Sequence, residues 1–231
     1  MPANFKGMTR GFLRIALLAA SLLVPAAAVT APSTEAQASV SIAVGFDALV
    51  KDADIVAVVT PVEAKSLWED GRITTYTRVK VEQGVAGELG TGGEGWVRTL
   101  GGVVGKIGQL VDGEPVFVNG KSTLVFMHKF KTGGTYEVSA RAQGQYPIVL
   151  DDVTKAKKLI RSANAGMLYP PKAKAPEVVP GPVQPQTQSG GATLSSEKIK
   201  LAQEVLHDRA FDEASREISV AWKRLHPAAT K

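Results

Sequence analysis

Short runs of β-branched residues, separated by turn signals about every 8 to 12 positions, constrain the fold of this chain more than any other feature. Residues 55–64 (IVAVVTPVEA) are apolar on both alternating faces, which is typical of a buried strand. Residues 73–82 (ITTYTRVKVE) alternate cleanly, with Tyr76 and Arg78 on the polar side, which indicates a half-buried strand. Asp70-Gly71 between the two runs predicts a hairpin. Further strands are expected at 96–100, 122–130, 135–142 and 146–150. The pattern predicts a mainly β fold, a small antiparallel barrel or sandwich.

Two segments flank or interrupt these strands. Residues 46–54 (FDALVKDAD) predict a short helix with Phe46, Leu49 and Val50 on one side. Residues 84–95 (GVAGELGTGGEG) are dense in glycine, and we expect a long loop there.

The last third of the chain changes character. A barrel domain is expected over 39–152, a basic helical segment over 153–166, and a Pro/Gly/Gln-rich linker over 167–194. An amphipathic helix is predicted over 195–226, capped by Ser195 or Ser196 and ended by Pro227. Its apolar stripe consists of Ile199, Ala202, Leu206, Ala210, Ala214, Ile218, Ala221 and Leu225.

The first 38 residues resemble an export signal. Positive residues Lys6, Arg10 and Arg14 precede an apolar run over 15–29, and Ala36-Gln37-Ala38 offers a small-x-small cleavage pattern. Cleavage is expected after Ala38, with the alanines at 26–28 as the second choice and an uncleaved anchor as the alternative. The run is too short for a convincing membrane span, so we expect an exported, periplasmic or extracellular protein without a span after cleavage.

Composition narrows the classes of function. The chain has no cysteine, which excludes cysteine-based metal or nucleophile chemistry, and its three histidines show no metal-ligand spacing. Residues 39–152 carry 11 Lys and Arg against 14 Asp and Glu, whereas 153–231 carry 13 against 7. A mildly acidic folded part argues against nucleic-acid binding, while the basic C-terminal region permits peripheral contact with an anionic surface.

Catalytic motifs are weak. The segment GGVVGKIG (101–108) lacks the spacing, the Ser or Thr and the helix of a phosphate loop, so we interpret it as tight turns that are also able to approach a partner closely. The sequence has neither a GxSxG nor an HExxH motif. His128 is expected to be a core or edge histidine. Asp151-Asp152 predicts either a cation contact or a helix cap. No cofactor, metal or catalytic residue is predicted.

The run of motifs ADIVAVVTPVEA, ITTYTRVKVEQGVAG, GWVRTLGG, GKSTLVFMHKF and TYEVSARAQG resembles the netrin-like, tissue-inhibitor-of-metalloproteinase type of OB-fold module. The resemblance covers residues 46–152, about half of the chain. It implies a small antiparallel OB-like β-barrel that works by binding and performs no reaction. Animal inhibitors of this type use an N-terminal cysteine, which this chain lacks.

The predicted function is therefore that of a non-enzymatic exported protein whose barrel binds a protein partner. The candidate contact residues are Tyr76, Arg78 and Arg98 on one sheet face and Trp68 at the hairpin end beside it, with the glycine-rich loop over 84–95 as a further candidate. Two alternatives stay open. One is a hydrolase whose site is dispersed in the sequence, and the other is a structural protein tethered to the envelope through its last helix.

Overall fold

The structure is a computed structural model, and it describes residues 40–88, 92–130, 134–171 and 199–227. The predicted export signal and most of the predicted linker therefore lie outside the described residues. No described helix has the length and apolar character that crossing a membrane requires.

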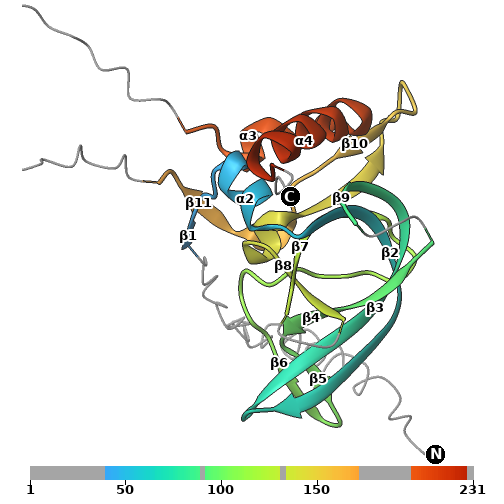
Figure 1. The fold of residues 1–231 in the computed structure, drawn as a ribbon. Helices are drawn as coiled ribbons and strands as arrows, with labels where there is room; N and C mark the ends of the chain where they lie inside the picture. The colour runs from blue at the N-terminus through green and yellow to red at the C-terminus, as the bar shows by residue number, and fades with distance from the viewer. Residues whose placement is uncertain (1–39, 89–91, 131–133, 172–198, 228–231) are drawn as a thin grey trace, which may run out of the picture. The chain divides into compact units, whose positions relative to one another are not determined.

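The fold is mainly β, as predicted, with three α-helices among the described residues. Figure 1 shows the elements in chain order. Their bounds are β1 (Val40–Ile42), α2 (Phe46–Asp52), β2 (Ile55–Glu69), β3 (Arg72–Gly87), β4 (Glu94–Leu100), β5 (Gly102–Val104), β6 (Ile107–Gln109), β7 (Thr123–Lys129), β8 (Thr135–Val138), η1 (Arg141–Gly144), β9 (Gln145–Leu150), β10 (Lys157–Leu159), η2 (Ala163–Ala165), β11 (Met167–Tyr169), α3 (Ala202–Leu206), β12 (Arg209–Ala210) and α4 (Phe211–Leu225).

The large sheet has the strand order β12-β10-β9-β7-β2-β3-β4-β8, and β7 also pairs with β8. Pairing therefore runs from β7 through β2, β3, β4 and β8 and returns to β7. The β4–β8 pair is parallel, and the other pairs along this path are antiparallel.

The first five residues of β2 and most of β7 are buried on both faces, as the apolar pattern at the start of β2 predicted, whereas β2 becomes exposed from Val62 onward. Ile55, Ala57 and Val59 belong to one core, together with inward residues of β3, β4, β7 and β8. Val56 and Val58 belong to a second core that includes α2, α3 and α4. The same alternation continues on β7, so successive side chains of each strand enter different cores.

The second core lies under the helices. Phe46, Leu49 and Val50 of α2 enter it on one side of that helix, as expected. Helix α4 contributes Phe211, Ala214, Ile218 and Ala221 to the same core. Figure 1 shows α2, α3 and α4 gathered near β9 and β10. The residues after 152 therefore share a core with the strands before it, and the predicted domain boundary at 152 is wrong.

The predicted basic helix over 153–166 is also wrong. This segment forms a hairpin turn and strand β10, which pairs antiparallel with β9. One carboxylate oxygen of Asp151 accepts hydrogen bonds from the backbone N–H groups of Val153 and Thr154, and Lys155 adopts φ 58°. The turn directs Leu159 into the core, where it is fully buried. The predicted linker also begins too early, because β11 occupies 167–169 and pairs with β1.

The predicted helix over 195–226 is interrupted among its described residues. Helix α3 ends at Leu206, Asp208 adopts φ 59°, and β12 pairs with β10 before α4 begins at Phe211. The reason is the placement of Phe211. This large side chain begins a new stripe at helical spacing and is buried, whereas Ala210 is only partly buried.

Two further boundaries differ from the sequence prediction. Strand β3 continues to Gly87, so its last residues are not the expected glycine loop, and register shifts on the β2–β3 pair accommodate the extra length. Residues 102–109 form a hairpin of β5 and β6 that contacts β2 and β3.

Candidate binding face

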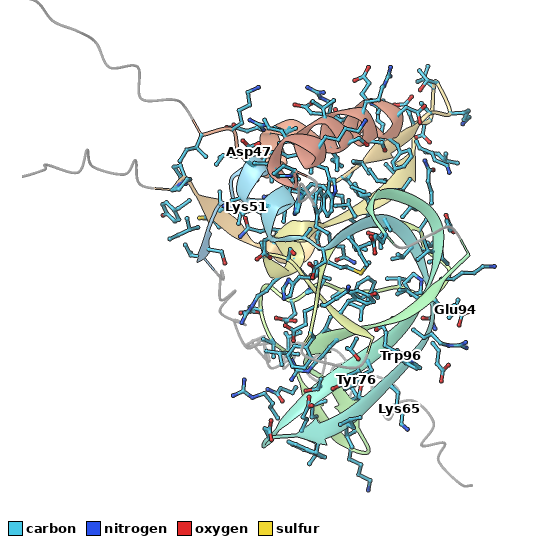
Figure 2. The ribbon with its side chains drawn as sticks, viewed as in Figure 1. Asp47, Lys51, Lys65, Tyr76, Glu94 and Trp96 are labelled. Atoms are coloured by element: carbon cyan, nitrogen blue, oxygen red, sulfur yellow. The ribbon has the colours of Figure 1, made fainter. Side chains whose placement is uncertain are left out.

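Side chains of β2, β3, β4 and β8 form two rows across one outer surface of the sheet, which we call the open face. The strand register places Lys65, Tyr76, Arg98 and Glu137 opposite one another in one row. The second row contains Glu63, Arg78, Trp96 and Thr135. Residues between the rows, Thr77 and Val97 among them, are buried on the other side of the sheet. Figure 2 shows Lys65, Tyr76, Trp96 and Glu94 along this stretch.

Arg98 is held by two carboxylates. Its Nη2 lies 2.9 Å from Oε2 of Glu69, and its Nη1 lies 2.6 Å from Oε1 of Glu137. The guanidinium carbon is 4.6 Å from the ring centroid of Phe130, a cation–π distance. Only 14% of the Arg98 side chain is exposed. Arg98 therefore fixes three strands and an aromatic ring in place, and its own cation is already paired.

These contacts shift the pKa values of Arg98 and Glu69. Burial by itself lowers the pKa of Arg98, but hydrogen bonds with Glu69 and Glu137 outweigh it and raise the pKa above the usual value. The hydrogen bond from Arg98 lowers the pKa of Glu69. Tyr76 also donates to Glu69, at 3.1 Å. Each shift favours the charged form, so the Arg98–Glu69 pair stays ionised through the neutral range.

Arg78 makes a second, more exposed bridge. Its Nε lies 3.0 Å from Glu63 and its Nη1 lies 3.0 Å from Glu94. The hydrogen bond with Glu94 raises the pKa of Arg78. Of the side chain, 38% is exposed, so Arg78 offers a solvent-facing cation where Arg98 does not.

Trp68 does not share the open face with the other three predicted residues. Strand alternation puts it on the side opposite Lys65 and Glu69, where it pairs in register with the fully buried Ile73. Its side chain is half exposed near the end of the β2–β3 hairpin. The structure thus brings Tyr76, Arg78 and Arg98 together and separates Trp68 from them.

The glycines at 101 and 102 explain how the β5–β6 hairpin is seated. Gly102 has φ 130°, and a Cβ atom there would overlap Oγ1 of Thr75 and would lie 2.5 Å from Oγ of Ser66. The close approach that the glycines permit is therefore made to the chain's own β2–β3 hairpin.

His128 lies partly exposed on β7, which pairs on both sides, and polar groups surround its ring. Its Nδ1 is 3.2 Å from Oγ of Ser139 and 3.4 Å from Asp52, while Nε2 is 3.7 Å from Glu137. The residue types match those of a nucleophile, a base and an orienting acid. Ser139, however, is fully buried, so a substrate carbonyl has no route to its hydroxyl. The arrangement ties α2, β7 and β8 together.

Asp151 serves its own turn and caps no helix, because the segment after it forms strand β10. Besides the two backbone donors, Lys158 lies 3.0 Å from its second oxygen. The backbone of Thr154 and then Lys158 lower the pKa of Asp151. Within the described parts of the chain, no group of three or more histidine or acidic side chains is placed to hold a metal ion.

Sequence reasoning missed Glu69, Glu137 and Phe130, the partners of Arg98. Glu137 sits on a strand that pairs in parallel with β4, a long-range pairing that no local pattern reveals. The position of Glu69 could have predicted its contact with Tyr76, since Glu69 precedes the Asp70-Gly71 turn and faces the same side of the sheet as Tyr76.

Comparisons of the chain with protein-family models, with curated proteins and with solved structures find no match.

Proposed function

We propose that this chain is an exported, non-enzymatic binding protein whose β2-β3-β4-β8-β7 strands form an OB-like barrel. The barrel would hold a protein partner on the open face. One observation carries the proposal. The helices cover one outer surface of the strands, whereas no element among the described residues covers the open face, which consists of the row of Lys65 and the row of Glu63.

The strand pairings support the barrel. If β2, β3, β4, β7 and β8 are numbered 1 to 5, the pairing order is 1-2-3-5-4 and back to 1, with strands 3 and 5 parallel. A five-stranded, partly open Greek-key barrel is the OB architecture. The resemblance to netrin-like modules remains part of the proposal.

The position of the open face supports its role. OB-type barrels bind ligands through the face of strands 2 and 3 and the adjoining loops. In this chain those strands are β3 and β4, which carry Tyr76, Arg78, Trp96 and Arg98. Tyrosine, tryptophan and arginine are the side chains that contribute most at protein interfaces. Because Arg98 and its two carboxylates are already fixed, little side-chain entropy would be lost there on binding.

The packing of α4 weakens the tether alternative. That alternative needs a free apolar stripe, but Phe211, Ala214, Ile218 and Ala221 are buried in the chain's own core. The buried Ser139 likewise weakens the hydrolase alternative.

Site-specific photo-crosslinking in cells that produce the full chain tests the proposal. A photoreactive residue replaces Lys65 on the open face or, as the matched control, Val220 on the exposed side of α4. We expect one defined protein adduct from position 65, none from position 220, and loss of the adduct when Arg78→Ala and Tyr76→Ala are added. An adduct formed only from position 220, or none from position 65, contradicts the proposed face.

A further inference from the structure

Strands β1 and β11 form a parallel sheet of only two strands, set apart from the large sheet. Two-stranded sheets are marginal on their own, and parallel pairs are usually buried within larger sheets. Here Val40, Ile42, Met167 and Tyr169 are all more than half exposed. A parallel pair this small and this exposed is unusual, and its free edge is open to a further strand.

The register defines which backbone groups of β1 face outward. Val40 pairs with Met167 and Ile42 with Tyr169, and the N–H of Ala43 donates to the carbonyl of Tyr169. In a parallel ladder with this register, residues 41 and 43 bond to β11, whereas the N–H and C=O groups of Val40 and Ile42 point to the opposite edge.

The side chain of Gln143 already begins a ladder at that outer edge. Its Oε1 accepts from the N–H of Val44 at 2.9 Å, and its Nε2 donates to the carbonyl of Ile42 at 3.0 Å. The amide thus imitates one residue of a neighbouring strand. Beyond it, the N–H of Ile42 and the C=O of Val40 have no hydrogen-bond partner among the described residues.

A polar cavity continues from this edge. It has a volume of about 500 Å³, and its lining includes Val40, Ser41, Gln143 and Arg141. Arg141 and the preceding Ala140 both adopt φ 54°, a left-handed conformation that residues other than glycine rarely hold. Such backbone strain gathers at binding sites when the surrounding structure enforces it.

The guanidinium of Arg141 remains available. In the described parts of the chain its ion pair is through Nε, 3.3 Å from Oε1 of Glu114, and 59% of its side chain is exposed. Asp112 is exposed and lines the same cavity. Because its carboxylate would repel a second one, a carboxylate that enters the cavity must lie next to Arg141. The cavity combines a cation, a carboxylate and two free backbone groups in line with β1.

We propose that the outer edge of β1 takes up an extended peptide segment as a third strand, with a carboxylate of that segment bound by Arg141. Strand addition supplies backbone hydrogen bonds to Ile42 and Val40, and the arginine selects an acidic residue. A second copy of β1 is a poorer occupant, because two three-residue edges offer few bonds and do not fill the cavity. This site is separate from the open face and goes beyond the proposed function.

Selection from a phage-displayed library of random decapeptides on the full chain tests this inference. Ile42→Pro removes the outward N–H without breaking a bond to β11, and Ile42→Val keeps that N–H as the matched control. We expect selected peptides to contain an acidic residue, to bind Ile42→Val normally, and to bind Ile42→Pro and Arg141→Ala at least about tenfold more weakly. Hydrogen exchange at the Ile42 amide should slow when the peptide binds.

Several results overturn the inference. These are a selection that enriches no peptide, peptides that bind Ile42→Pro as tightly as the native chain, and a concentration-dependent dimer that Ile42→Pro abolishes. If Ile42→Pro fails to fold, peptides methylated at single backbone nitrogens replace it, and methylation at one position, the nitrogen that donates to the C=O of Val40, must then abolish binding while methylation at the two adjacent positions does not. Loss of the photo-crosslink at position 65 does not bear on this site, so the two proposals fail separately.

Discussion

The two outer surfaces of the large sheet differ in chemistry although they share strands β2 and β3. Near the start of β2, Val56 and Val58 belong to the core that residues of α2, α3 and α4 share. Nine residues after Val56 on the same strand, Lys65 lies in a row of paired charges and aromatic rings. One strand therefore supplies both a packing surface and an exposed surface, and the change takes place at the register shift after Pro61.

The contrast shows what each kind of contact contributes. Burying apolar side chains under the helices stabilises the fold, at roughly 25 cal/mol per Å² of apolar surface. Exposed ion pairs add little to stability, but they fix side chains in one arrangement. We therefore expect substitutions on the covered face to change stability and substitutions on the open face to change binding.

Phe126→Ala on β7 should have the largest effect. The ring is fully buried in the core under the helices and meets Tyr146 edge to face at a centroid distance of 6.3 Å. Removing it should lower the free energy of unfolding by about 3–5 kcal/mol in urea denaturation. A loss below about 1 kcal/mol would show that the helices do not pack on β7 as described.

Ile218→Ala tests the packing of α4 itself. Ile218 is fully buried, and we expect a loss of about 2–4 kcal/mol in the same assay. Val220→Ala on the same helix is the control, because Val220 is mostly exposed and should change stability by less than about 0.5 kcal/mol. Equal losses from both substitutions would mean that α4 has no preferred face.

Gly102→Ala tests how the β5–β6 hairpin is seated beside the open face. The added Cβ has no room next to Thr75 and Ser66, and φ 130° is unfavourable for alanine. We expect a loss of about 2 kcal/mol. Gly105→Ala, where the Cβ enters open space at φ 62°, should cost only about 1 kcal/mol. If Gly105→Ala proved the more damaging, the close approach at Gly102 would be wrong.

Arg98→Ala should cost about 2 kcal/mol near neutral pH, because Glu69 and Glu137 lose the cation that pairs them. The folded state lowers the pKa of Glu69, so this contribution is present above the unfolded pKa of about 4.5 and is lost as the pH falls through the lower, folded pKa. The stability gap between native chain and variant should therefore narrow in acid. A gap that is constant between pH 7 and pH 3 contradicts this pairing.

Arg78→Ala should have the smallest effect on folding. Its bridges to Glu63 and Glu94 are exposed, and such pairs contribute little. We expect the urea midpoint to match that of the native chain within error, while the photo-crosslink from position 65 weakens. A clear drop in the midpoint would mean that the open face stabilises the fold.

Local patterns predicted the strands well and the last third of the chain poorly. The alternation of 73–82 and the Asp70-Gly71 turn correctly predicted β3 and its hairpin, because each signal is contained in a short stretch of sequence. The segment after Asp151 has helical character by composition, but its pairing with β9 and the burial of Leu159 decide the structure. Tertiary contacts of this kind leave no local trace.

The candidate site was predictable to a similar degree. Alternation placed Tyr76 and Arg78 on one side of β3, and the β4 register added Arg98. Trp68 was chosen for its place at a hairpin end, and strand alternation directs its side chain away from the open face. Glu137 required the parallel β4–β8 pairing, which joins segments about 40 positions apart.

The most direct test of the account is the affinity of the crosslinked partner for paired variants of the two surfaces. The double variant Tyr76→Ala/Arg78→Ala alters the open face, and Val220→Ala alters the outer side of the covering helix. We predict that the double variant weakens equilibrium binding at least about tenfold while Val220→Ala changes it by less than about twofold. Unchanged binding by the double variant, with weakened binding by Val220→Ala, would contradict the assignment of the open face.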